Sequence, residues 1–179
     1  MRRRYDANED GFVLITSLVF LVVLTSVVIY SIRGATIYER SASNSRNHSQ
    51  AFQAAEYALL QAQGRLVSPP ADDGSSNCVG GLCGTAANTS SFTTASYWLA
   101  SSSNKDKSCA VNGACNVGGS AAKAEVPNVG EQPRYILKKL TPGTDSQTSC
   151  DYYEVTSFGT GGSAESAVVL RAIVKTCMS

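Results

Sequence analysis

The sequence is short of the residues from which most enzyme active sites are built. Its 179 residues include a single histidine, His48, and only 16% are charged, below the usual quarter. It has no acidic cluster and no G-x-S-x-G motif, and a catalytic nucleophile needs a base within reach. We therefore expect a protein that is not an enzyme and that carries no catalytic residue, no cofactor and no metal. The net charge of +1 likewise excludes nucleic acid as the expected partner.

What is present is one long apolar block near the N-terminus. Residues 12–32 read FVLITSLVFLVVLTSVVIYSI, without charge, proline or glycine. At 1.5 Å per residue this block forms about 31 Å of helix, which matches the hydrocarbon thickness of a bilayer. Its hydroxyl side chains are tolerable because they can bond to carbonyls of their own helix. The pattern predicts a transmembrane helix over residues 12–32.

A polar leader, MRRRYDANEDG at residues 1–11, precedes this helix. Its three arginines predict a cytoplasmic N-terminus by the positive-inside rule, so the chain after residue 33 is expected in the periplasm. Such a compartment is oxidising and favours paired cysteines. A cleaved secretory signal is the alternative. However, the apolar run is too long for one, and Arg33 follows it in place of an A-x-A-like site.

The junction between Gly11 and Phe12 is abrupt, and it resembles the type III signal of type IV prepilins. That resemblance implies cleavage after Gly11 by a prepilin peptidase, which would also methylate the new terminal amine of Phe12. The fifth residue of the processed chain is Thr16, where pilins usually carry Glu. A carboxylate in hydrocarbon costs about 2.5–3.5 kcal/mol and persists only with a partner. Threonine therefore suits a tip subunit with no neighbour ahead of it, and a loss without meaning is the alternative.

An amphipathic helix is predicted over residues 33–68, because the chain lacks proline until Pro69 and Pro70 stop it. Polar residues Arg40, Arg46, Asn47 and Gln50 are expected to be solvated or to face other subunits. Apolar residues then recur at steps of 3 and 4, which places them on one helix face. The members of this stripe, expected to pack on a sheet, are Phe52, Ala55, Leu59, Ala62 and Leu66.

Residues 69–179 are predicted to form a globular head rich in strands and stapled by disulfides. No regular element is assigned between residues 67 and 131, where Ser, Gly, Ala and Asn dominate. Six cysteines allow 15 connectivities. Local pairing, with Cys78 to Cys83, Cys109 to Cys115 and Cys150 to Cys177, is the first interpretation. A zinc site is disfavoured by the cysteine spacing and by the one distant histidine.

Three segments alternate as strands do: residues 134–140 (RYILKKL), 152–158 (YYEVTSF) and 167–175 (AVVLRAIVK). A turn is expected near Gly162, with residue 158 roughly opposite residue 167 and Cys150 within two residues of Cys177. The glycine-rich segment at residues 159–162 lacks the Gly-Lys-Ser/Thr of a phosphate loop. One face of the last strand is expected to cover the helical stripe: Val168, Leu170, Ala172 and Val174.

The segment around residues 39–59 resembles the N-terminal region of PilX-type minor pilins, in its ER-x-A-x-N-x-R stretch (39–46) and its AFQAAEYAL stretch (51–59). The strand, glycine-rich turn and final strand resemble the end of such proteins. The resemblance implies an α+β pilin-like fold, with a long N-terminal helix packed on an antiparallel sheet.

The same resemblance implies a structural minor pilin at or near the tip of a type IV pilus, which primes pilus assembly. Its implied partners are other minor pilins, the major pilin, a large tip adhesin, the inner-membrane assembly platform and the prepilin peptidase. The chain would sit in the inner membrane and then in the extracellular pilus, which serves adhesion and twitching motility. Two alternatives stay open: the tip pseudopilin of a type II secretion system, and an adhesin domain that contacts surfaces.

Overall fold

The computed structural model describes residues 10–68, 72, 74–100, 102–113, 115, 125–140 and 150–177. It contains two compact units, Met1–Ser43 and Asn44–Ser179. The described residues of the first unit are all helical and belong to α1 (Asp10–Arg65), which continues into the second unit. No proline interrupts these 56 residues, so the ladder of backbone hydrogen bonds is continuous.

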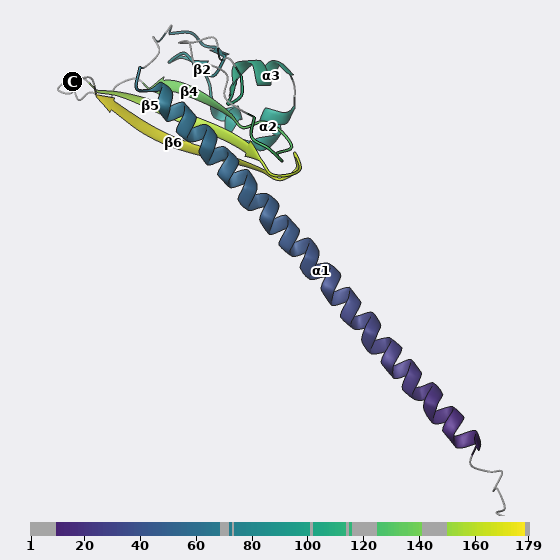
Figure 1. Ribbon diagram of the computed structural model, residues 1–179. Helices are drawn as coiled ribbons and strands as arrows, with labels where there is room; N and C mark the ends of the chain where they lie inside the picture. Colours follow the sequence, from purple (N-terminus) through teal and green to yellow (C-terminus); the bar gives the residue numbers. More distant parts are fainter. Residues whose placement is uncertain are drawn as a thin grey trace, which may run out of the picture. The chain divides into compact units, whose positions relative to one another are not determined.

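The second unit is built on a six-stranded sheet with the path β1-β2-β4-β5-β6 and with β3 paired to β4 (Figure 1). Its three long strands, β4 (Arg134–Leu140), β5 (Cys150–Thr160) and β6 (Ala167–Cys177), are antiparallel neighbours. The strands β1 (Cys78–Val79), β2 (Leu82–Cys83) and β3 (Cys109–Ala110) have two residues each. Because β2 runs parallel to β4, the sheet is mixed and not purely antiparallel as expected.

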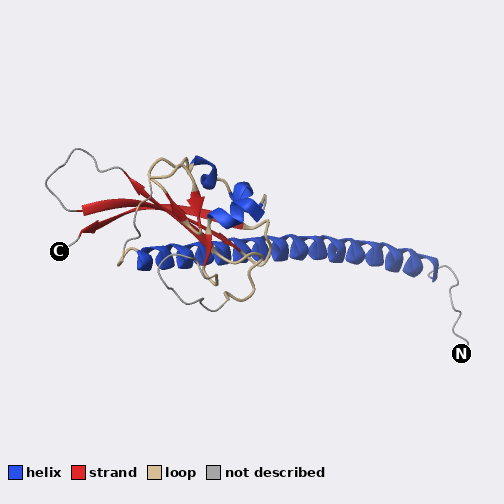
Figure 2. Ribbon diagram, turned by 90° about the horizontal axis from the view of Figure 1, so that it is seen from above, coloured by secondary structure: helices blue, strands red, loops and turns tan. Residues whose placement is uncertain are grey.

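The two faces of the sheet bury different partners, as the period of 2 along a strand requires. One face packs on the C-terminal part of α1 through Tyr135, Leu137, Tyr153 and Val155. The opposite face is covered by η1 (Ser90–Thr93), α2 (Ala95–Leu99) and their neighbours; α3 (Ser102–Lys107) follows α2. Figure 2 shows the resulting layers, with the long helix on one side of the strands and the short helices on the other.

An aromatic cluster fills the layer beneath the short helices. Trp98 stacks on Phe158 of β5 with ring centroids 5.4 Å apart, and its edge meets Phe92 at 5.0 Å. The indole Nε1 donates to the carbonyl of Phe92 at 2.8 Å, so its one polar group is satisfied. This cluster gives a core to a segment in which the sequence pattern assigns no regular element.

The β5–β6 hairpin differs in detail from the expected one. Both strands are longer than predicted, and Thr160 pairs with Ala167, so Phe158 faces Val169 instead. The turn therefore comprises residues 161–166. Cys150 pairs directly with Cys177 at the open end of the hairpin.

Candidate functional site

The first unit presents the apolar block of α1. All residues from Phe12 to Ile32 are exposed within the structure, and this part of α1 is long and apolar enough to cross a membrane. The block contains five serine and threonine side chains, and each donates to a carbonyl three or four residues earlier on the same helix, as expected. The hydroxyl hydrogens of these five side chains therefore need no partner from the lipid.

The position that usually carries Glu in pilins is filled by a neutral, internally bonded side chain. Thr16 Oγ1 lies 3.1 Å from the carbonyl oxygen of Phe12 and 2.9 Å from that of Val13. Its hydroxyl proton is thereby used within the first turns of α1, and the side chain carries no charge with which to bind an amine. Gly11 and Phe12, the expected processing junction, both lie in the first turn of α1, while residues 1–9 of the leader lie outside the described residues.

In the second unit, α1 contacts the sheet through small side chains. The buried residues of this face, called here the alanine seam, are Ala51, Ala54, Ala55, Ala58, Ala62 and Leu66. Three of the predicted stripe residues, Ala55, Ala62 and Leu66, belong to it, and Leu59 is half-buried beside it. Phe52 does not: its side chain is 41% exposed, so its expected burial is wrong.

Phe52 is turned away from the sheet because β5 approaches the backbone of α1 closely. A Cβ added to Gly159 would overlap with the amide nitrogen of Ala55 and lie 2.7 Å from the carbonyl oxygen of Ala51. A Cβ on Gly161 would overlap with the carbonyl oxygen of Asn47. The helix backbone thus rests directly on the strand backbone, which excludes a phenylalanine from the contact. Phe52, about 100° around the helix from Ala51, points away.

Polar contacts hold both ends of the seam. Gln50 Nε2 donates to the carbonyl oxygen of Asn128 at 2.7 Å, and Asn47 packs against Gly161. Asn47 and Gln50 therefore contact their own head, contrary to the expectation that they are solvated or face other subunits. At the other end, the Arg65 guanidinium lies 5.7 Å from the ring centroid of Tyr135, and its Nη1 donates to the hydroxyl of that tyrosine at 3.2 Å.

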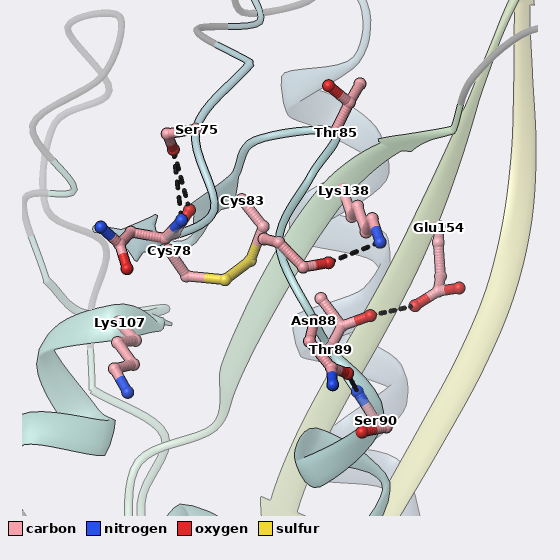
Figure 3. The surroundings of a disulfide bond; sticks show 12 residues. Ser75, Cys78, Cys83, Thr85, Asn88, Thr89, Ser90, Lys107, Lys138 and Glu154 are labelled. Carbon is pink, nitrogen blue, oxygen red and sulfur yellow. Dashed lines mark hydrogen bonds between the residues drawn. A yellow bond between two sulfur atoms is a disulfide. The ribbon is translucent and has the colours of Figure 1, made fainter.

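Three disulfides staple the head, and their connectivity coincides with the local pairing expected from the sequence. Cys78 bonds to Cys83 across the β1–β2 hairpin with a Cα–Cα distance of 4.0 Å (Figure 3). Cys109 and Cys115 are 5.6 Å apart, and Cys150 and Cys177 are 4.0 Å apart. Each bridge closes a turn or a hairpin.

Charged side chains attach the disulfide-bearing segment to the sheet. Glu154, buried on β5, accepts a hydrogen bond from Thr89 Oγ1 at 3.0 Å and pairs with Arg171 of β6. Lys138 Nζ donates to the carbonyl oxygen of Ala87 at 2.6 Å (Figure 3). Because a buried carboxylate is stable only when it is paired, this network fixes residues 87–89 on the face of the sheet opposite α1.

A second polar group lies near the end of β4 and the start of β5. Asp72 accepts a hydrogen bond from the backbone N–H of Gly74 at 3.1 Å, and this bond, with a second from Thr85, lowers the pKa of Asp72. The hydrogen bond from Lys139 Nζ to Asp151, 2.8 Å long, raises the pKa of Lys139. Within the described part of the chain, no group of three His, Cys, Asp or Glu side chains is placed to hold a metal ion. His48 is exposed on α1.

Comparison with protein-family models identifies the chain over most of its length. Residues 10–60 match the PilX N-terminal model, and residues 79–176 match the model described as "Type IV pilus assembly protein PilX C-term". No curated protein and no solved structure matches the chain. The two models together cover the apolar block, the seam as far as Ala58 and most of the sheet, so this chain belongs to the PilX family of type IV pilus assembly proteins.

Proposed function

We propose that this minor pilin acts at or near the tip of a type IV pilus and primes its assembly with other minor pilins. Membership in the PilX family supports a structural subunit over an enzyme. It also favours the pilus over the type II secretion system that the sequence pattern left open. In this role α1 packs against the helices of neighbouring subunits through its exposed apolar block, and the head serves as a rigid cap.

Processing is part of the proposal. Cleavage between Gly11 and Phe12 would remove the charged leader and leave Phe12 as a methylated terminus. The partners that we propose are the prepilin peptidase, the inner-membrane assembly platform, the major pilin and a large tip adhesin. The head would cross to the periplasmic side before the subunit enters the filament. N-terminal sequencing of membrane-extracted protein tests the first step, because a start at Met1 or near Ala35 contradicts it.

The observation that carries the tip position is the neutral, internally bonded Thr16. A subunit that follows another must accommodate that neighbour's terminal amine, and a carboxylate at this position does so. In a subunit with nothing ahead of it, a carboxylate at this position would stay unpaired in hydrocarbon, which is unfavourable by about 2.5–3.5 kcal/mol.

The experiment is a pair of substitutions in a pilus-forming strain. Thr16→Glu should lower the number of pili per cell severalfold, because the carboxylate has no amine to pair with during priming. Thr16→Val, which keeps the shape and stays neutral, should leave the pilus number unchanged. Normal piliation with Thr16→Glu, and incorporation of that variant along the shaft, would show that a neighbour does precede this subunit and would remove the tip position.

A further inference from the structure

A stripe of four exposed side chains begins at the end of the apolar block of α1. Its members recur at steps of 3, 4 and 3 residues, and we call them the interfacial stripe: Tyr30, Arg33, Ile37 and Arg40. At about 100° per residue these steps keep all four within about 80° of one another around the helix. One side of the first unit therefore presents apolar and basic side chains in alternation.

The two arginines of this stripe have no acidic partner in the described part of the chain. A helical side chain reaches the positions three and four residues away, and around Arg33 and Arg40 these hold only Ile, Tyr, Thr, Ser and Asn. Glu39, the one acidic residue of segment 30–43, lies about 100° from Arg40 and about 120° from Arg33 around the helix. The ion pairs among the described residues involve neither arginine. Both charges are therefore open to a ligand from outside the chain.

The stripe lies at the depth of the lipid headgroups when the apolar block spans a bilayer. Arg33 directly follows the last residue of the block, and at 1.5 Å per residue Arg40 lies about 12 Å beyond it. The headgroup layer on each side of the hydrocarbon is about 5–7 Å thick. Helix side chains tilt toward the N-terminus and arginine has a long stem, so both guanidinium groups can reach that layer. Tyr30 lies at the boundary itself, where tyrosine is enriched.

We propose that the interfacial stripe binds the phosphate groups of anionic phospholipids on the side of the membrane where α1 emerges. The guanidinium groups of Arg33 and Arg40 would donate to phosphate oxygens, and Tyr30 would pack against the first acyl carbons below them. A lipid is the occupant that the position selects. The stripe continues the membrane-spanning block, so a headgroup phosphate lies beside it whenever that block is in the bilayer.

The leaflet, which is the periplasmic one, and the role of the contact rest on the proposed function. Basic residues usually concentrate on the cytoplasmic side, as they do in the leader, so an arginine pair on the other side calls for a ligand. Cleavage after Gly11 would remove the three arginines of the leader. The bonds of Arg33 and Arg40 to lipid would then hold the processed subunit at a fixed depth until it enters the filament.

The test uses the full chain in phosphatidylcholine vesicles with a small fraction of photoreactive lipid, either phosphatidylglycerol or phosphatidylcholine with the reactive group on its head. Peptide mass spectrometry after illumination measures the label on residues 30–40 and, separately, on the leader. Phosphatidylglycerol should label residues 30–40 several-fold more than phosphatidylcholine does. Because an arginine near an anionic lipid surface contributes about fivefold in affinity, Arg33→Gln/Arg40→Gln should lower that label at least fivefold.

Arg46→Gln is the matched control, because Arg46 is also exposed but belongs to the second unit and lies outside the stripe. It should change the label on residues 30–40 less than twofold. The label on the leader should be the same with and without the substitutions, since its own arginines are retained. The fluorescence of Trp98 verifies that the variants fold.

Three results would overturn the proposal. The first is equal labelling of residues 30–40 by the two lipids. The second is a label that the double variant leaves unchanged, which would leave the arginines to an acidic surface of another protein. The third is an equal fall with Arg46→Gln, which would show a general effect of charge. Because labelling is measured without pili, it can fail while Thr16→Glu still behaves as the tip position requires.

Discussion

The contact between α1 and β5 predicts that one methyl group at Gly159 destabilises the head substantially. In the Gly159→Ala variant the new Cβ would overlap with the amide nitrogen of Ala55 and lie 2.7–2.8 Å from backbone atoms of Ala51 and Ala54. These are backbone atoms, so no side-chain rotation relieves the overlap. The helix must move outward, by close to 1 Å to reach ordinary contact. A gap of 0.5–1 Å forfeits about a quarter to a half of each dispersion contact along the seam.

From this displacement we expect the free energy of unfolding of the head to fall by about 2–3 kcal/mol, in the upper part of the range for overpacked cores. For a head of this size that corresponds to a decrease in Tm of about 6–15 °C. Trp98 is a direct reporter, because it is the chain's one tryptophan and stacks on Phe158, the residue before Gly159. Thermal unfolding of the full chain in micelles, followed by Trp98 fluorescence, measures the loss.

A matched control lies on α1 itself. A Cβ on Gly64 meets nothing within 4 Å, and this residue has helical backbone. Gly64→Ala should therefore raise the stability by about 0.5–1 kcal/mol, through reduced backbone entropy of the unfolded chain. If Gly159→Ala unfolds at the temperature of the unmodified protein, the direct backbone contact between α1 and β5 is refuted.

Three other outcomes follow from the same geometry. Leu66→Ala should lower the free energy of unfolding by about 2–5 kcal/mol because it leaves a cavity, whereas Phe52→Ala should lower it by less than about 1 kcal/mol because the ring is largely exposed. Denaturant midpoints that rank the two variants in the reverse order would contradict the packing of the alanine seam. Cys177→Ser opens a 27-residue separation and should cost about 3–4 kcal/mol in the chain-entropy model, lowering subunit abundance while N-terminal sequencing still finds the processed chain. The backbone N–H of Gly74 stabilises the carboxylate of Asp72 and lowers its pKa below the ordinary 3.8. Its contribution to the free energy of unfolding is therefore present above pH 4 and is lost as the pH falls through the lowered pKa. In a titration of stability against pH, an Asp72→Asn variant should lose less stability at acid pH than the unmodified protein.

Periodicity was sufficient where side chains alone decide the structure. The segment 134–140 forms β4 with the predicted bounds, and the uncharged block yields continuous helix. The strands β5 and β6 each extend two residues further toward the cysteines than predicted, because register pairing continues to the Cys150–Cys177 bridge.

Other features were hidden because they depend on backbone approach between distant segments. The glycines at 159 and 161 look like turn residues in the sequence, yet Gly159 lies within β5 and both make room for α1. Periodicity places Phe52 on the same helix face as Ala55 and Leu59, but it does not show that the approach of β5 excludes the phenylalanine ring. The sequence pattern does not predict the structure of the segment after residue 67 either, because its order comes from disulfides and from a few aromatic contacts such as Trp98 on Phe158.

The locality of the three disulfides has a consequence for how the head matures. The bonded cysteines are separated by 5, 6 and 27 residues, and shorter loops cost less entropy to close. Among the 15 ways of pairing six cysteines, the native one therefore contains the easiest closures. A newly translocated chain would need an oxidant but little reshuffling by thiol–disulfide exchange, since wrong long-range pairs form more slowly than the correct short ones. Oxidation would then keep pace with the delivery of the chain.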